Sequence, residues 1–365
     1  MKAWVLHSVN DIRFEEPSLP VPKDDEVLIR VRAAGVCGSD IPRIFKNGAH
    51  KMPLIPGHEF SGVVEATGLK ADSSLKGRKV GIYPLIPCGK CVPCREGHPE
   101  TCRDYDYVGS RRDGAFSEFV AVPARNVRVL PDNISFEEAA MLEPMAVSVH
   151  ALRLALGLSA DEDSRGKSFF NTDKRIVVCG LGTIGLLLTM FLLERGLKRI
   201  YVIGNKEKQR EMAVSLGIAE ENFLDSGAGD VSLELRKKAG EADIFFECVG
   251  KNECVSYGIE NTAANGRVLL LGNPYSDMGL SRDTYWKILR NQLLVRGSWN
   301  STFLPGDSED TEDDWDYVIK RLKEKKIRPA ELITHRLSIA DLYRGFSIMH
   351  EKSEYFCKVM MTNPG

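Results

Sequence analysis

A glycine-rich turn directly after a short apolar segment constrains the fold of this chain more than any other feature of its sequence. Residues 175–179 have the sequence RIVVC, an apolar run typical of strands that are buried on both faces of a parallel sheet. Residues 180–185, GLGTIG, fit the pattern G-x-G-x-x-G and open a segment with helical spacing. Strand and helix patterns alternate from there to about residue 271, which predicts βαβ units and a doubly wound α/β sheet.

The spacing of these glycines predicts a dinucleotide site. Gly180 allows a tight turn, Gly182 lets a pyrophosphate approach the backbone, and Gly185 lets the helix pack closely against the strand. The amides of Thr183 and Ile184 at the helix N-terminus favour a phosphate. A glycine turn in another kind of α/β protein is the alternative.

The end of the second strand of this sheet bears on the choice of cofactor. A carboxylate about 20 residues beyond the glycines would bind the ribose 2′-hydroxyl of NAD. Gly204, Asn205 and Lys206 stand there instead. The glycine leaves room, and the other two side chains can bond a phosphate. The sequence therefore favours NADP over NAD, with solvated basic residues at a helix start as the alternative.

The length and charge of the chain exclude several classes of protein. Its 365 residues exceed the roughly 100–150 of one typical domain, so two domains are expected. Lys and Arg total 49 against 51 Asp and Glu, which excludes a nucleic-acid binder that works by bulk positive charge. No apolar run approaches the roughly 20 residues that span a bilayer, and no secretion signal is apparent. We therefore expect a cytoplasmic protein that does not act on a membrane.

Residues 1–150 are β-rich, with short strand patterns separated by Gly and Pro, as in a sandwich or a partly open barrel. The polar stretch 159–173 is expected to be a surface loop between two domains. The acidic run 306–316, GDSEDTEDDWD, is expected to be a solvated helix start, since acidic residues favour helix N-termini.

The cysteines point to metal. Nine of them, an odd number in a chain without a secretion signal, favour metal binding or catalysis over a disulfide framework. Four follow the spacing C-x₂-C-x₂-C-x₇-C, namely Cys88, Cys91, Cys94 and Cys102. Four thiolates can close a tetrahedral cage around zinc, and because a closed cage leaves no position for substrate, this zinc should be structural. An iron–sulfur cluster and unrelated free thiols are the alternatives.

Four further residues are candidates for a catalytic zinc, which needs about three protein ligands and one exchangeable position. Cys37 lies in the segment GVCGSD, His58 and Glu59 follow a glycine, and Glu143 precedes a proline. Sequence spacing alone does not assemble them. A histidine beside a glycine is often a turn residue, and a Glu-Pro pair is common at helix ends, so both interpretations stay open.

Taken together, these residues resemble the zinc-dependent medium-chain dehydrogenases. The resemblance covers essentially the whole chain and rests on elements in that family's order: Cys37, Gly57-His58-Glu59, the four-cysteine lobe, Glu143-Pro144 and the nucleotide fingerprint. Glutamate at position 143 is similar to the polyol dehydrogenase branch, which includes sorbitol dehydrogenase. The resemblance implies a GroES-like β-barrel catalytic domain at 1–150, completed by 296–365, and a Rossmann domain at 151–295. It also implies a homodimer or a homotetramer.

The resemblance further implies a zinc-dependent alcohol dehydrogenase with one catalytic and one structural zinc. Cys37, His58 and Glu143 would hold the catalytic zinc, with Glu59 as a fourth ligand or as a group behind the ligands. Zinc would act as a Lewis acid on the substrate hydroxyl, Ser39 would pass its proton outward, and hydride would go to the nicotinamide.

Three stretches carry a narrower resemblance, to the galactitol-1-phosphate dehydrogenases of the polyol branch: residues 37–50, 105–114 and 297–300. Neither zinc nor the generic fold requires them, so they are expected to inform on the substrate, a small polyol or polyol phosphate. The candidate substrate contacts are Ser39, Arg43, Lys46, Arg111, Arg112 and Trp299. Arginine makes bidentate phosphate contacts, although exposed basic residues usually only solvate a surface.

Three other functions stay open at this point. The first is a dehydrogenase of unphosphorylated polyols, such as sorbitol or xylitol, on the same fold and zinc. The second is a non-catalytic nicotinamide-binding relative, which the presence of Cys37 and Glu143 disfavours. The third is a redox sensor built on the cysteine lobe, which the metal-like spacing of the lobe disfavours.

Overall fold

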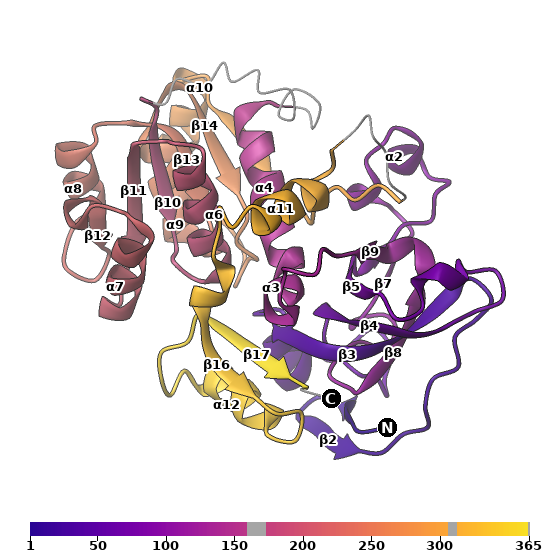
Figure 1. Cartoon of the computed structure of the whole chain (residues 1–365). Coiled ribbons are helices and arrows are strands. Elements are labelled where there is room, and N and C mark those ends of the chain that lie inside the picture. The colour runs from indigo at the N-terminus through magenta and orange to yellow at the C-terminus, as the bar shows by residue number, and fades with distance from the viewer. Residues whose placement is uncertain (159–172, 306–311, 364–365) are drawn as a thin grey trace. The chain divides into compact units, whose positions relative to one another are not determined.

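The chain forms two compact units in the computed structural model, which describes residues 1–158, 173–305 and 312–363 (Figure 1). The first unit comprises Met1–Pro144, Thr302–Glu309 and Trp315–Gly365, and the second comprises Met145–Ser301 and Asp310–Asp314. Most of the polar stretch predicted to be a surface loop, residues 159–172, lies outside the described residues, and so does the first part of the acidic run, 306–311.

A seven-stranded sheet is the main element of the first unit. Its strand order is β16-β17-β3-β4-β5-β9, with β8 paired to β3, and neighbours are antiparallel except for β16 and β17. Strand β3 lies at its centre, where it pairs with β17, β4 and β8. Nearly all of its residues are therefore buried. The strands are β3 (Glu26–Val36), β4 (Glu59–Thr67), β5 (Lys79–Ile82), β8 (Phe119–Pro123), β9 (Val127–Val129), β16 (Ile333–Leu337) and β17 (Lys358–Thr362).

Short elements complete the first unit. They are β1 (Ala3–Ser8), β2 (Asp11–Glu15), β6 (Leu85–Ile86), β7 (Asp106–Tyr107), α1 (Asp40–Pro42), α2 (Val92–Arg95), α3 (Phe136–Ala140) and α12 (Leu342–Glu351). Helix α12 contributes Leu342, Phe346 and Met349 to the apolar core that the sheet and the N-terminal hairpin also fill. Their spacing of four and three residues places them on one helix face, so the C-terminal segment is packed into this unit.

The second unit is a parallel sheet of six strands in the order β12-β11-β10-β13-β14-β15. In chain order this is 3-2-1-4-5-6, the order of a doubly wound dinucleotide-binding sheet, so the predicted α/β sheet is confirmed. The order reverses between β10 and β13, where such sheets bind ligands. The strands are β10 (Arg175–Cys179), β11 (Arg199–Gly204), β12 (Phe223–Asp225), β13 (Ala242–Glu247), β14 (Thr262–Leu270) and β15 (Leu294–Gly297).

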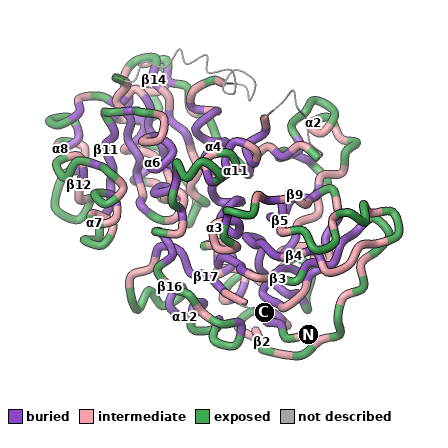
Figure 2. The backbone as a smooth tube through the Cα atoms, viewed as in Figure 1, coloured by how far each residue is buried: buried purple, intermediate pink, exposed green. Residues whose placement is uncertain are grey.

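Helices connect these strands: α6 (Thr183–Glu194), α7 (Glu207–Leu216), α8 (Val231–Lys238), α9 (Asn252–Glu260) and α10 (Arg282–Arg290). Side chains of Asp230 and Ser281 accept hydrogen bonds from the first turns of α8 and α10, which satisfies amides that a helix start leaves without a partner. Strand β11 is buried almost throughout, whereas α7 and α8 expose one side (Figure 2). The sheet is therefore the core of this unit.

The end of the acidic run is not solvated, contrary to the expectation from sequence. It lies at the start of α11 (Asp314–Lys323), where Asp313 and Asp314 are buried. The carboxylate of Asp314 lies 2.9 Å from His150 Nδ1 and 2.7 Å from Arg153 Nη1, both on α4 (Leu142–Leu156). A buried carboxylate requires such partners. They are more than 150 residues away in the chain, so local sequence could not reveal them.

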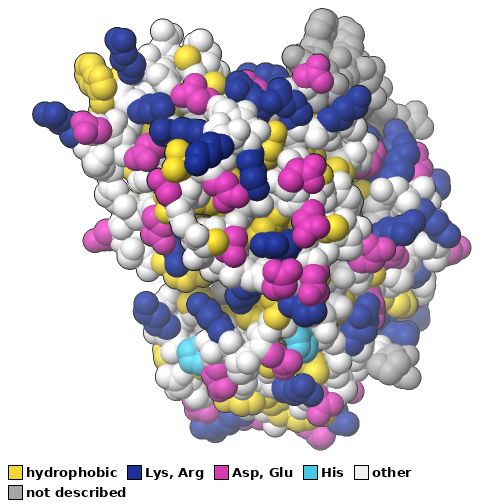
Figure 3. All heavy atoms as spheres, turned by 90° about the vertical axis from the view of Figure 1, so that its left-hand side faces the viewer, with side chains coloured by type: hydrophobic (Ala, Val, Ile, Leu, Met, Phe, Trp, Pro, Cys, Tyr) yellow, Lys and Arg dark blue, Asp and Glu magenta, His cyan; other side chains and the backbone are white. Residues whose placement is uncertain are grey.

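Basic and acidic side chains are interspersed on the face that Figure 3 draws, in keeping with the net charge of −2. A field of one sign, as nucleic acids attract, is not seen on the described residues of that face. None of the described helices combines the length and the apolar character that crossing a membrane requires.

Candidate active site and metal centres

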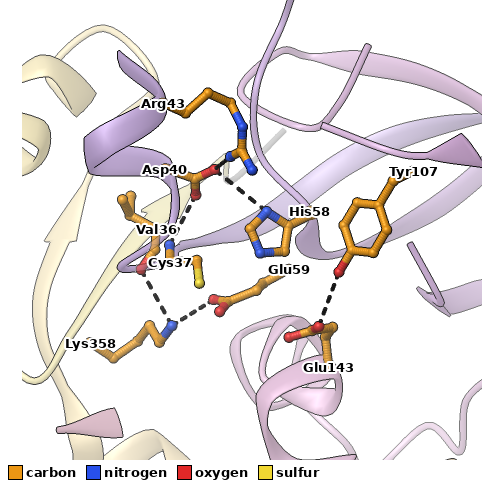
Figure 4. Close-up of polar contacts among 9 residues, drawn as sticks. All are labelled: Val36, Cys37, Asp40, Arg43, His58, Glu59, Tyr107, Glu143 and Lys358. Atoms are coloured by element: carbon orange, nitrogen blue, oxygen red, sulfur yellow. Dashed lines mark hydrogen bonds and ion pairs between the residues drawn. The ribbon is translucent and has the colours of Figure 1, made fainter. Parts of the chain in front are cut away.

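Cys37, His58 and Glu59 come together in the first unit. Cys37 directly follows β3, Glu59 is the first residue of β4, and the pairing of these strands sets Gly35 opposite Glu59. One potential ligand atom from each of the three lies within 4.8 Å of the others (Figure 4). The histidine and the glutamate are buried, and the cysteine is partly buried. A thiolate, an imidazole and a carboxylate form a donor set that suits zinc.

Asp40 lies behind the cysteine and the histidine. Its Oδ2 accepts a hydrogen bond from the Cys37 amide at 3.0 Å, and its Oδ1 lies 3.5 Å from His58 Nδ1. That contact is long for a hydrogen bond, and Nδ1 is otherwise an orphaned buried atom among the described residues. Burial alone would lower the pKa of His58, but Asp40 and Cys37 together raise this pKa well above its ordinary value. A carboxylate at Nδ1 leaves the second ring nitrogen for a metal and makes it more basic.

Lys358 holds the carboxylate of Glu59. It is the first residue of β17, it is buried, and its Nζ donates to Glu59 Oε2 at 2.5 Å and to the Val36 carbonyl at 3.3 Å. Burial alone would lower the pKa of Lys358, yet Glu59 and Cys37 keep it above the usual value. A side chain at Gly35 would collide with the same carboxylate. Glycine at position 35 thus lets Glu59 keep this orientation towards Lys358.

Glu143 lies beside this group and faces another partner. It is buried in the first turn of α4, and among the described residues it falls outside the group whose ligand atoms lie within 4.8 Å. Its Oε1 lies 3.3 Å from the Tyr107 hydroxyl, and the Tyr107 ring meets the His58 ring edge-on at 5.7 Å between centroids. Burial raises the pKa of Glu143 to about 7, and burial also raises the pKa of Tyr107 well above its usual value.

The stretch 105–114, expected to inform on substrate, also supports the Gly57 turn. Gly57 has φ +100°, a conformation that glycine adopts readily. A Cβ at Gly109 or Gly114 would collide with the backbone of Gly57. The amide of Gly114 donates to the Ile55 carbonyl at 2.7 Å, and the amide of Ala115 donates to the Gly57 carbonyl at 2.9 Å. This docking fixes His58 and Tyr107 together, so these glycines serve the site itself.

Two of the candidate phosphate ligands are engaged in ion pairs. Arg43 pairs with Asp40, and its side chain is therefore part of the support of the Cys37 group. Arg112 donates to Glu26 at 2.5 Å. Glu26 is the first residue of β3 and Cys37 follows its last, so the structure does not bring Arg112 to the Cys37 group.

The other candidate substrate residues are more available. Arg111 stacks on the Tyr105 ring at 4.3 Å from the centroid, Lys46 is exposed, and Ser39 is partly buried just before α1. Trp299 is 55% exposed and belongs to the second unit.

The four-cysteine lobe has the geometry of a metal cage. The sulfurs of Cys88, Cys91, Cys94 and Cys102 lie within 4.8 Å of one another. Cys91 Sγ lies 3.4 Å from Cys94 Sγ and 3.8 Å from Cys102 Sγ. Four sulfurs at about 2.3 Å from one zinc in a tetrahedron would be about 3.8 Å apart. The lobe therefore fits zinc without rearrangement of its backbone.

The protonation of these thiols supports the same conclusion. Backbone hydrogen bonds from Arg103 and Cys94 lower the pKa of Cys91 to about 6, whereas burial raises the pKa of Cys94 to about 12. Neighbouring sulfurs cannot all become thiolates when they repel each other at this distance. A divalent cation would remove that repulsion, so the donor set suits a metal.

In the second unit, the glycine turn has the features of a phosphate-binding loop. Gly180 has φ +99°, and a side chain at Gly185 would collide with the Gly180 carbonyl. Gly182 is the N-cap of α6, where Thr183 and Ile184 form the first turn, and the space that its Cβ would enter is open. This arrangement leaves backbone amides at the helix N-terminus for an anion.

Gly204 ends β11, and Asn205 and Lys206 follow it as exposed residues. The Asn205 amide donates to Gln209 Oε1 at 3.0 Å, and Gln209 Nε2 donates to the Leu181 carbonyl at 3.1 Å. Gln209, which sequence reasoning did not single out, thus links the end of β11 to the glycine turn. Because 28 residues separate Gln209 from Leu181, no local sequence pattern indicates this contact.

Comparisons with known proteins identify the family. Residues 23–132 match the alcohol dehydrogenase GroES-like domain, and residues 183–324 match the zinc-binding dehydrogenase family. Galactitol 1-phosphate 5-dehydrogenase of Escherichia coli (strain K12) is 33% identical over 338 residues, which cover 92% of this chain and 92% of that protein. The chain belongs to the zinc-binding alcohol dehydrogenase family. It is an oxidoreductase of that class, as the sequence predicted.

Solved structures and a further curated relative are similar to this chain over nearly its whole length. The crystal structure of galactitol-1-phosphate dehydrogenase from Escherichia coli matches with a TM-score of 0.86 and 31% identity over 100% of both chains. A protein described as a zinc-binding dehydrogenase from Sinorhizobium meliloti 1021, bound to NADP, matches with a TM-score of 0.85 and 25% identity over 99% of both chains. L-idonate 5-dehydrogenase of Vitis vinifera is 27% identical, covering 93% of this chain and 88% of that protein. The prediction of a GroES-like part and a Rossmann part is confirmed.

Proposed function

We propose that this dehydrogenase oxidises a secondary hydroxyl of a polyol or polyol phosphate and passes hydride to a nicotinamide cofactor. The group of Cys37, His58 and Glu59, with donor atoms within 4.8 Å of one another, carries the proposal. The 33% identical relative from Escherichia coli is named for galactitol 1-phosphate, which is a polyol phosphate.

The donor set fits a catalytic zinc. Cys37, His58 and one of the carboxylates of Glu59 and Glu143 supply three ligands, which is the number that leaves a position open. The orphaned Nδ1 of His58 faces Asp40, as expected when the other ring nitrogen binds a metal. When bound, zinc would polarise the substrate hydroxyl and the nicotinamide would accept the hydride.

The surrounding residues have separate roles in this proposal. Asp40 fixes the His58 ring and the Cys37 amide. Lys358 neutralises Glu59, so that a buried group with a thiolate and a carboxylate does not carry an uncompensated negative charge. Ser39, two residues after Cys37, is assigned the transfer of the substrate's proton towards solvent.

The four-cysteine lobe is assigned a second, structural zinc, because all four of its ligands come from the protein. For the catalytic and cofactor domains we keep the proposed bounds 1–150 with 296–365 and 151–295, which differ by about six residues at each change of unit from the compact units Met1–Pro144 and Met145–Ser301. The pyrophosphate of the cofactor would bind at the glycine turn and the start of α6, which comprise Gly180, Gly182, Thr183, Ile184 and Gly185.

NADP is favoured over NAD. The turn after β11 offers Gly204, Asn205 and Lys206 and no carboxylate to bind the ribose 2′-hydroxyl. Asn205 and Lys206 are both exposed at this turn, and both residue types can bond a 2′-phosphate. The relative from Sinorhizobium meliloti 1021 was solved with NADP.

For a phosphorylated substrate, Lys46 and Arg111 are the better candidates for phosphate contacts, with Ser39 and Trp299 as further candidates for substrate contacts. Arg43 is engaged by Asp40, so its replacement would disturb the zinc support as well as any phosphate contact. Lys46→Ala should raise KM for a polyol phosphate by about tenfold, the loss of one charge-assisted contact. KM for the free polyol should stay unchanged, and an equal rise for both substrates would contradict a phosphate pocket.

A spectrophotometric screen of polyols and polyol phosphates with NAD⁺ and NADP⁺ tests the whole proposal. We expect turnover of at least one such substrate and two zinc ions per chain by metal analysis. Cys37→Ser should lose turnover and one zinc, while NADP binding and the melting temperature are retained. Full turnover in Cys37→Ser, or no oxidation of any polyol by the zinc-loaded wild type, would overturn the proposal. Preference for unphosphorylated polyols would favour the sorbitol or xylitol type.

We also propose that the dehydrogenase assembles as a homodimer or homotetramer. Strand β15 is an edge of the six-stranded sheet, and its Leu294 is exposed. Helix α10, which precedes it, exposes Tyr285, Trp286 and Leu289. An exposed edge strand beside exposed large apolar side chains favours pairing with another chain.

A further inference from the structure

Two carboxylates, Glu59 within the group of Cys37, His58 and Glu59 and Glu143 beside it, are held by different partners. Glu59 lies inside the group and is bound by the buried cation of Lys358 at 2.5 Å. Glu143 lies outside the group and meets only a neutral phenol in Figure 4, the hydroxyl of Tyr107 at 3.3 Å. A buried lysine cation compensates the charge of a carboxylate, whereas a phenol donates a single hydrogen bond and brings no charge. The two glutamates are therefore not equivalent.

The backbone that carries the Tyr107 side chain is held by several contacts. Tyr107 belongs to β7, which pairs with β6 through Leu85. Its carbonyl accepts hydrogen bonds from the amides of Arg111 and Arg112, at 2.9 and 3.2 Å, in the following turn. The next part of the loop docks on Gly57 through Gly109 and Gly114. The backbone thus fixes the phenol relative to His58 and to the start of α4.

We propose that Tyr107 is a positioning residue that holds the Glu143 carboxylate off the metal, so that a coordination position stays open to the substrate. The inference rests on the proposed function, since it takes Cys37 and His58 as zinc ligands. Two described features carry it: Glu143 is buried beside the group yet outside it, and its oxygen faces the phenol. Tyr107 acts through Glu143 and is itself no ligand.

Tyr107→Phe tests this inference, because it removes one oxygen and keeps the ring against His58. Without the phenol, Glu143 is free to occupy the open position. We expect the catalytic zinc to be lost to a chelator about fivefold more slowly, which corresponds to about one hydrogen bond. The absorption spectrum of the cobalt-substituted protein should change, because a carboxylate replaces a water. KM should rise while kcat with saturating substrate changes less, because the carboxylate competes with substrate.

Two further variants make the result specific. Tyr105→Phe is the matched control, since Tyr105 lies on the same loop and contacts Arg111 and the Tyr107 ring instead of Glu143. Tyr105→Phe should leave the rate of zinc loss, the absorption spectrum of the cobalt-substituted protein and KM at wild-type values. In a Glu143→Ala background, Tyr107→Phe should have no further effect on zinc loss, because the group that it releases is gone.

Three outcomes would overturn the inference. Faster zinc loss in Tyr107→Phe would show that the phenol supports a metal-bound Glu143. An unchanged spectrum and KM would show that the phenol does not position the carboxylate. The same effect with and without Glu143 would show that Tyr107 acts on another group. Failure of the proposed function differs from all three, because Cys37→Ser would then retain both zinc ions or full turnover.

Discussion

The carboxylate of Asp243 in the second unit shows how one side chain can fix two strands. It accepts hydrogen bonds from the backbone amide of Arg175 at 2.7 Å and from Nε and Nη2 of the same residue at 3.1 Å each. Arg175 begins β10, and Asp243 is the second residue of β13. The contact thus closes one end of the strand pair whose other end carries the glycine turn.

Asp243→Asn should lower the stability of the second unit. The amide keeps the shape and loses the charge-assisted bonds, and partial solvent exposure limits the loss to about 1 kcal/mol at pH 7. Burial raises the pKa of Asp243, but hydrogen bonds from Arg175 outweigh this and lower it. Because the folded pKa is depressed, the contribution is complete above the unfolded value of about 3.9. It is lost as pH falls through the folded pKa.

Thermal unfolding of Asp243→Asn and wild type between pH 7 and pH 3 checks this. The difference in melting temperature should shrink as the pH falls. Asp283→Asn is the control, because Asp283 and its partner Arg282 are almost fully exposed and such pairs contribute little. An equal loss in both variants, or a difference that does not depend on pH, would contradict the assignment.

At the scale of residues, the sequence predicts candidate metal ligands better than it predicts the residues that hold those ligands in place. The family resemblance predicts Cys37, His58 and Glu143 as ligands, with Glu59 as a fourth ligand or behind them. The structure groups Cys37 and His58 with Glu59 and places Glu143 outside the group. Lys358 was not predicted, because it contacts Glu59 from 299 residues further along the chain. Tyr107 lies in residues 105–114, a stretch whose sequence resemblance points to the substrate and not to Glu143. Contacts that depend on strand pairing leave no local pattern of residues.

At the scale of elements, the turn between β10 and α6 separates two roles of glycine. A side chain at Gly185 would collide with the Gly180 carbonyl, so this glycine allows the helix to pack on the strand. Gly182 has φ −83°, which any residue can adopt, and no atom lies within 4 Å of the place of its Cβ. Its absent side chain leaves space for a ligand.

Gly182→Ala and Gly185→Ala should therefore have different effects on NADP binding and on the melting temperature. Gly182→Ala should keep the melting temperature within about 1 °C and weaken NADP binding about tenfold or more, because the methyl group stands where the pyrophosphate approaches. Gly185→Ala should lower the melting temperature by several degrees, because overpacking costs about 1–3 kcal/mol. Calorimetry of binding and of unfolding measures both quantities. A destabilised Gly182→Ala with unchanged NADP binding would contradict this division.

Periodicity predicts those elements that are long, apolar and regular. The buried strand β10 has the predicted bounds, and helix α6 begins within the glycine turn as predicted. Strands β16 and β17 left no comparable pattern, and their place in the sheet depends on pairing with β3. Only the family resemblance assigned the C-terminal segment to the catalytic domain. The physical reason is that a strand's partner is chosen by the whole sheet.

At the scale of the whole molecule, β15 and α10 leave several large apolar side chains exposed among the described residues of the second unit. The sheet ends at β15, whose outer edge is not paired within the described residues. Leu289 on α10 is 53% exposed beside Tyr285 and Trp286. Such side chains are costly to leave in water when they gather on one helix. Their burial by a second copy of the chain would explain them.

Leu289→Asp should shift the protein towards monomers, because a carboxylate in an apolar interface has no partner. Leu233→Asp is the matched control: Leu233 lies on α8 of the same unit and is 51% exposed, against 53% for Leu289. Light scattering coupled to size-exclusion chromatography should find the wild type and the control assembled and Leu289→Asp dissociated, with zinc content equal in all three. A monomeric wild type would contradict the proposed assembly. Dissociation of Leu233→Asp alone would place the interface on α8 instead of α10.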